Sequence, residues 1–120
     1  MVAPAPAGAA EVAILKSADL AAYNQAISGF KAAMPSSTTF VEYDMQGDMA
    51  RGRKLAQKIS ASEATLLLAV GVKAALAAKQ EVADIPVIFC MVLDPAKHDL
   101  KAPNMTGIRP VFTSEKLGVR

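Results

Sequence analysis

Short runs of apolar residues alternate along this chain with longer segments in which apolar residues recur every three or four positions. Residues 12–15 form the first apolar run, and its length is typical of a buried strand. In the segment that follows, large apolar residues fall on one face of a helix that is expected to end before Pro35. These residues are Leu20, Tyr23, Ile27, Phe30 and Met34.

The same unit of strand and helix then repeats. Residues 38–43 have the composition of a strand, and Asp48 is a candidate N-cap for a helix that runs to about Ser60. Residues 64–70 are a continuous apolar strand that Gly71 ends, and an alanine-rich helix follows it. The last part of the chain predicts a fourth strand at residues 87–92, a short fifth strand at residues 104–108 and a helix start at residues 114–117.

Apolar strands joined by helices, with no hairpin signal between them, are typical of a parallel sheet covered on both faces. Right-handed crossovers leave few topologies, and the simplest is a flavodoxin-like α/β three-layer sandwich with strand order 2-1-3-4-5. Leu15, Leu67, Ile88 and Phe89 are expected in its core. In this fold a ligand crevice lies where the strand order reverses, beyond the carboxyl ends of strands 1 and 3.

Two segments therefore become candidates for ligand binding, one after the first strand and one after the third. Both are expected to open helices, whose free first-turn amides can hold a carboxylate. Ser17 would add a hydroxyl and Lys73 a positive charge, while Asp94, beyond the fourth strand, would accept a hydrogen bond from an amine. The candidate residues are Ser17, Ala18, Asp19, Gly71, Val72, Lys73 and Asp94.

Each candidate also has a purely structural interpretation. Ser17 or Asp19 could cap the first helix, Gly71 could serve a tight turn, and Asp94 with Pro95 could form an ordinary turn. The convergence of these residues on one edge of the sheet is what favours a ligand site.

Composition and charge exclude several classes of function for this chain. The 120 residues, 52% of them hydrophobic and 20% charged, fit one α/β domain at residues 11–120, preceded by a flexible segment rich in alanine and proline at residues 1–10. That segment lacks the basic start and apolar middle of a complete signal peptide. A net charge of +2 and the absence of tryptophan argue against a nucleic-acid partner. Cys90, the single cysteine, is expected as a buried structural thiol.

Signals of an enzyme, a metal or a cofactor are missing. The loop after the first strand has no glycine with which to cradle a phosphate. His98 stands without the cysteine or histidine partners of a zinc site, and residues 69–71 lack the acceptor aspartate of a receiver domain. We therefore expect a protein that is not an enzyme, with no cofactor and no metal site.

The ordered series of motifs resembles the ABC-transporter solute-binding proteins related to tryptophan- and tyrosine-binding lipoproteins, which have a fold like that of type I periplasmic binding proteins. The match extends from about residue 11 to 109. Where many relatives have Gly-Thr-Pro after the third strand, this chain has Gly71, Val72 and Lys73, so a hydroxyl is lost and the backbone amides remain. The matching segments are Val12–Asp19, Glu42–Tyr43, Gly47–Asp48, Ala69–Gly71, Ala74–Ala75, Asp84–Val92, Asp94–Pro95 and Asn104–Gly107.

This resemblance implies the first of two lobes that close around a small molecule, such as an aromatic amino acid, and deliver it to an ABC permease. It also implies a periplasmic or membrane-anchored lipoprotein. Two other interpretations stay open: a stand-alone sensor or interaction domain that pairs through the lobe-facing surface, and a truncated product without independent activity. Because the second lobe is missing, we expect exposed apolar surface near the carboxyl edge and a tendency to self-associate.

Overall fold

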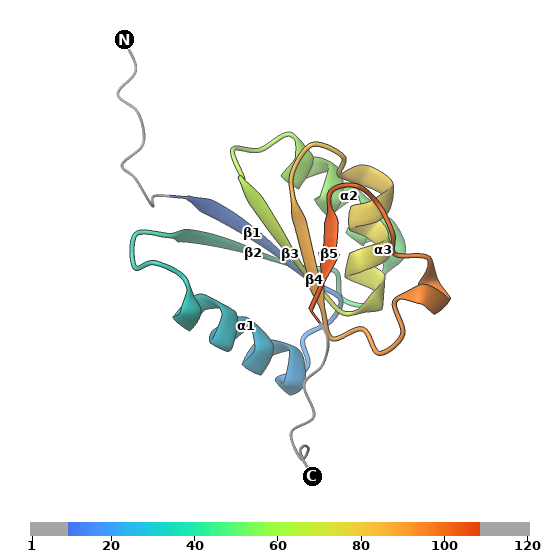
Figure 1. Ribbon diagram of the computed structural model, residues 1–120, viewed down its shortest axis with the longest axis horizontal. Helices are drawn as coiled ribbons and strands as arrows, with labels where there is room; N and C mark the ends of the chain where they lie inside the picture. The colour runs from blue at the N-terminus through green and yellow to red at the C-terminus, as the bar shows by residue number, and fades with distance from the viewer. Residues whose placement is uncertain (1–9, 109–120) are drawn as a thin grey trace.

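A five-stranded parallel sheet with strand order β2-β1-β3-β4-β5 forms the centre of the computed structural model, which describes residues 10–108 (Figure 1). The order and the parallel pairing confirm the α/β flavodoxin-like fold expected from the sequence. The strands are β1 (Glu11–Lys16), β2 (Thr39–Asp44), β3 (Leu66–Val70), β4 (Val87–Cys90) and β5 (Met105–Gly107). The helices are α1 (Ala21–Ala33), α2 (Met49–Ser60), α3 (Val72–Glu81) and the short 3-10 helix η1 (Ala96–His98).

The register of the sheet brings the loops that follow the strands to one edge. Lys16, the last residue of β1, pairs with Asp44 at the end of β2 and with Val70 at the end of β3. Val70 in turn pairs with Cys90 at the end of β4. Four strands thus end at one level, and we call the surface formed by the loops beyond them the carboxyl edge.

The two faces of the sheet are covered unequally. Helices α2 and α3 lie on one face and α1 lies alone on the other (Figure 1). The face under α2 and α3 carries the larger core cluster, in which four alanines of α3 are fully buried and let the helix pack closely on the sheet. On the other face, Ile27 of α1 packs against a smaller cluster that consists of Val12, Ile14, Leu68 and Val70.

This asymmetry corrects two expectations about the core. Leu15, Leu67 and Phe89 are buried as expected, whereas Ile88 and Cys90 are only half-buried. Both half-buried residues belong to the face that carries α1 alone, and they pack at the margin of the smaller cluster. Partial burial nevertheless raises the pKa of the Cys90 thiol, because desolvation disfavours the thiolate.

The elements otherwise lie close to where the sequence pattern places them. Asp48 caps α2 as expected, since its carboxylate accepts a hydrogen bond of 2.9 Å from the amide of Ala50. The fourth strand ends at Cys90 rather than at residue 92, because Met91 takes a left-handed conformation with φ of 62° and leaves the sheet. The helix start expected at residues 114–117 lies outside the described residues.

Candidate ligand-binding site

Ser17 joins the two loops on either side of the point where the strand order reverses. It is buried, and its hydroxyl donates a hydrogen bond of 2.8 Å to the carbonyl of Val70 at the end of β3. The same oxygen accepts a hydrogen bond of 2.9 Å from the amide of Ala74 in the first turn of α3. The hydroxyl therefore fixes the start of α3 against the end of β1, in addition to any contact it makes with a ligand.

Two amides at the start of α3 remain available for an anion. The amide of Gly71 donates to the carbonyl of Cys90, that of Ala74 donates to Ser17, and that of Ala75 makes the first helical bond to the carbonyl of Gly71. Among the described residues this leaves the amides of Val72 and Lys73 without an acceptor. The partial positive charge of a helix N-terminus favours a carboxylate at these two groups.

The loop after β2 closes this arrangement from the side of α2. The Lys73 ammonium donates a hydrogen bond of 2.7 Å to the carbonyl of Gly47, whose amide donates to the carbonyl of Ser17 at 2.8 Å. Gln46 and Gly47 both have positive φ, which turns the chain back at this position. The three loops after β1, β2 and β3 thus form one connected unit, and we call it the switch-point loops.

Gly71 allows the closest approach in the switch-point loops. Its φ of 93° and ψ of 166° fall in a region open essentially to glycine alone. A Cβ at this position would lie 2.6 Å from the hydroxyl oxygen of Ser17 and 2.9 Å from that of Tyr23. The structural interpretation of Gly71 as a required turn residue is therefore correct, and a ligand role for its backbone is compatible with it.

Tyr23 is a candidate site residue that the sequence pattern did not reveal. The pattern assigns it to the apolar face of the first helix, and its ring does pack against the core cluster on that face. Its hydroxyl, however, reaches the switch-point loops next to Gly71 and Ser17. The available signal was its position, since a tyrosine early in α1 can bury its ring and keep a polar tip at the carboxyl edge.

Asp19 and the start of α1 depart from expectation. Helix α1 begins at Ala21 with Leu20 as its N-cap residue, and no side chain caps it, so neither Ser17 nor Asp19 opens this helix. The Asp19 carboxylate instead accepts hydrogen bonds from Asn24 at 2.8 Å and from Lys16 at 3.0 Å. The bond from Asn24 and then the bond and charge of Lys16 lower the pKa of Asp19. Ala18 is half-buried between Ser17 and Asp19.

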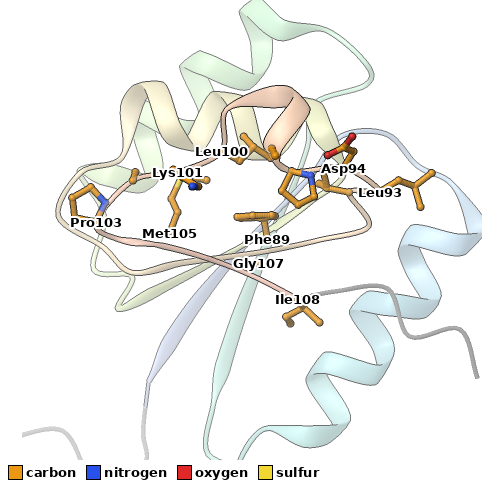
Figure 2. A pocket seen from close by; sticks show the side chains of 13 residues that line it. Phe89, Leu93, Asp94, Leu100, Lys101, Pro103, Met105, Gly107 and Ile108 are labelled. Carbon is orange, nitrogen blue, oxygen red and sulfur yellow. The ribbon is translucent and has the colours of Figure 1, made fainter.

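Asp94 lies apart from the switch-point loops. It is exposed, and its carboxylate accepts a hydrogen bond of 3.3 Å from the amide of Lys97 at the start of η1. It lines a groove of about 1190 Å³ between the loop after β4 and strand β5, which we call the β4–β5 groove (Figure 2). None of Ser17, Gly71 and Lys73 lines this groove.

The seven candidates thus separate into three places. Ser17, Gly71, Val72 and Lys73 come together as the switch-point loops. Ala18 and Asp19 lie before α1, where Asp19 is engaged by Lys16 and Asn24. Asp94 belongs to the groove.

The part of the chain from residue 10 to 108 contains no cluster of three or more histidine, cysteine, aspartate or glutamate side chains placed to hold a metal ion. No helix in the same range is long and apolar enough to cross a membrane.

Comparison with known proteins rests on structure, because the sequence matches no family model and no curated protein. A ligand-free, open substrate-binding protein with adhesive properties from Clostridium difficile aligns with a TM-score of 0.76 and 21% identity, over 89% of this chain and 41% of that one. A conserved domain protein from Vibrio cholerae aligns with a TM-score of 0.74 and 22% identity, over 84% of this chain and 38% of that one.

The third structure is an ABC domain in complex with L-Trp from Streptococcus pneumoniae, with a TM-score of 0.70 and 19% identity, over 83% of this chain and 38% of that one. The chain spans about two fifths of the length of each of these structures. It therefore has the fold of one part of a substrate-binding protein, as its sequence motifs suggested.

Proposed function

We propose that this chain is the ligand-capturing lobe of an ABC-transporter substrate-binding protein and that it binds a small carboxylate, with an aromatic amino acid as the first candidate. The proposal is supported by two structures that the chain resembles, a substrate-binding protein and an ABC domain in complex with L-Trp. In this role the chain binds and delivers its ligand and performs no chemistry on it.

The observation that carries this proposal is the pair of open amides at the start of α3. Val72 and Lys73 point their backbone N–H groups from a helix N-terminus at the carboxyl edge. The Lys73 ammonium has donor capacity left after its bond to Gly47, and the Tyr23 hydroxyl lies beside the same turn. A carboxylate bound here would meet two amides, one positive charge and one hydroxyl.

Transport also requires partners that lie beyond this chain. We propose that a second lobe closes over the carboxyl edge, that a membrane permease receives the ligand, and that the protein works in the periplasm or as a membrane-anchored lipoprotein. A lobe that offers only half of a cage buries little of a small ligand, so this chain alone should bind in the millimolar range, about −4 kcal/mol.

Backbone amide NMR during titration with L-Trp tests the site. The amide signals of Val72, Lys73 and Gly47 should shift together with a common midpoint. D-glucose, which has no carboxylate, is a suitable negative ligand. Shifts confined to other parts of the chain would refute the site, and nanomolar binding by this chain alone would refute the half-cage interpretation.

Two substitutions test separately what the Val72 amide and the Lys73 charge contribute to ligand binding. Val72→Pro removes one amide at the first helical position, where proline is tolerated and the preceding ψ of 166° is compatible with it. Lys73→Gln removes the charge and keeps the amide. Each should weaken L-Trp binding several-fold, and Lys79→Gln, at the other end of α3, should not change it.

A second candidate function is an interaction domain that pairs with another chain through the carboxyl edge. It is favoured by the exposed large apolar residues of the described chain, which occur in the loops beyond β1, β4 and β5.

A further inference from the structure

Large apolar residues are exposed at only a few positions between residues 10 and 108, and these positions are not scattered. Leu20, Met91, Leu93 and Ile108 are the exposed ones, and three of the four follow β4 or β5. Leu93 is 80% exposed and Ile108 is 48% exposed, and both line the β4–β5 groove. Two of the four exposed large apolar residues therefore border this groove.

The groove has an apolar floor that a glycine makes possible. Phe89 and Leu100 are buried beneath it and Met105 is half-buried along it. A Cβ on Gly107 would lie 2.5 Å from the Phe89 ring, so glycine at this position lets the ring lie against β5. Figure 2 shows Leu93 at one end of the groove with its side chain directed away from Phe89. Leu93 thus contributes little to the core of its own chain.

Charges of both signs border the same groove. Asp94 and Lys101 line it, and Lys97 lies between them in sequence, within η1. All three side chains are exposed, and none takes part in an ion pair within residues 10–108. Across a two-fold axis, Asp94 of one copy can face Lys101 of the other and the reverse, so a second copy supplies an opposite charge for each of these two side chains.

We propose that two copies of this chain pair through the β4–β5 groove, with Leu93 of each copy seated in the groove of the other. The apolar groove and the projecting leucine that would fill it occur on the same chain, which is the requirement for a two-fold symmetric interface. A partner of a single charge sign would pair with only one of Asp94 and Lys101, whereas a second copy pairs with both. This inference develops the interaction-domain candidate and does not depend on the switch-point loops.

Sedimentation velocity over a wide range of concentration tests the pairing, with a matched pair of variants. Leu93→Asp should raise the dimer dissociation constant about tenfold or more, because it places a charge in an apolar pocket. Leu20→Asp changes another exposed leucine, which lies outside the groove, and it should leave the dissociation constant unchanged. Circular dichroism is the control that both variants, Leu93→Asp and Leu20→Asp, are folded. A wild-type chain that stays monomeric, or equal effects of the two variants, would overturn the proposal.

Exchanging the charges at Asp94 and Lys101 tests how the charged borders of the two grooves face each other in the dimer. Asp94→Lys and Lys101→Asp should each weaken the dimer, and the double variant should recover most of the loss because the opposed charges are exchanged together. No recovery in the double variant would overturn the opposed arrangement. L-Trp titration of the monomeric Leu93→Asp variant separates the two proposals, since ligand shifts at Val72 and Lys73 should persist there whether or not the wild type forms a dimer.

Discussion

The switch-point loops and the β4–β5 groove share the carboxyl edge but are built in opposite ways. In the switch-point loops, the buried hydroxyl of Ser17, the carbonyl of Val70 and the ammonium of Lys73 all have partners within the chain. Around the groove, Asp94 and Lys101 form no ion pair among the described residues, and Leu93 lies in solvent. The first region is thus fixed by bonds within the chain, and the second is the surface that we propose a second copy completes.

The two regions also use glycine differently. A Cβ at Gly71 or at Gly107 would meet a neighbouring side chain at nearly the same distance, 2.6 Å or 2.5 Å. At Gly71 the neighbours are held by β1 and α1, and the φ of 93° excludes other residues. At Gly107 the neighbour is the ring end of Phe89, beside a three-residue edge strand. An alanine at position 71 should therefore destabilise the protein more than an alanine at position 107, although the two contact distances are nearly equal.

Gly71→Ala should have the largest effect of the predicted substitutions. Backbone strain and overlap with Ser17 together should lower the free energy of unfolding by about 2–4 kcal/mol, measured by urea denaturation. Gly29→Ala is the matched control, because it lies inside α1 with nothing near its added methyl group, and it should raise stability by about 0.5–1 kcal/mol. A loss below 1 kcal/mol at Gly71 would show that the switch-point loops are not rigid.

Ser17→Ala should rank next. It leaves the carbonyl of Val70 and the amide of Ala74 without their side-chain partner in a buried place, so the free energy of unfolding should fall by about 1–3 kcal/mol. Ser28→Ala, at an exposed position of α1, serves as the control and should change stability by less than about 0.5 kcal/mol. Equal losses of stability at the two serines would contradict the inference that the Ser17 hydroxyl holds the start of α3 against the end of β1.

Gly107→Ala should lower the free energy of unfolding by only about 1 kcal/mol, because the edge strand and the Phe89 ring can shift together. The same shift deforms the floor of the groove, so this variant should also weaken the dimer in sedimentation velocity. A loss as large as that at Gly71 would show that the groove is as rigid as the switch-point loops and would remove the contrast between them.

The smallest expected effect on the free energy of unfolding comes from the titration of Asp19. Hydrogen bonds from Asn24 and Lys16 hold the pKa of this carboxyl below its ordinary value of 3.8. The stabilisation is therefore present above pH 3.8 and is lost as the pH falls through the lower pKa of the folded state. Asn24→Ala and Lys16→Gln should each raise the pKa of Asp19 toward its ordinary value, as measured by NMR titration of the side-chain carboxyl carbon. An unchanged pKa in the Asn24→Ala variant would show that the hydrogen bond from Asn24 does not lower it.

Much of the architecture was predictable from local pattern because each strand and helix is defined by short-range periodicity and by turn residues. The 3- and 4-residue spacing from Leu20 to Met34 predicted α1, and Asp48 predicted the start of α2. The conformation of Met91 was not predictable, since methionine has no preference for positive φ, and the fourth strand ends earlier than its apolar run.

The sequence by itself determined the α/β class, the order of the strands and the edge at which the candidate residues of the switch-point loops gather, since periodicity and the handedness of crossovers act locally. Only the tertiary structure decided the state of each group at that edge. It placed the Tyr23 hydroxyl beside Gly71, engaged Asp19 with Asn24, and separated Asp94 from the switch-point loops. These outcomes depend on which side chains from distant segments meet within hydrogen-bond or van der Waals distance, and spacing along one chain does not specify such meetings.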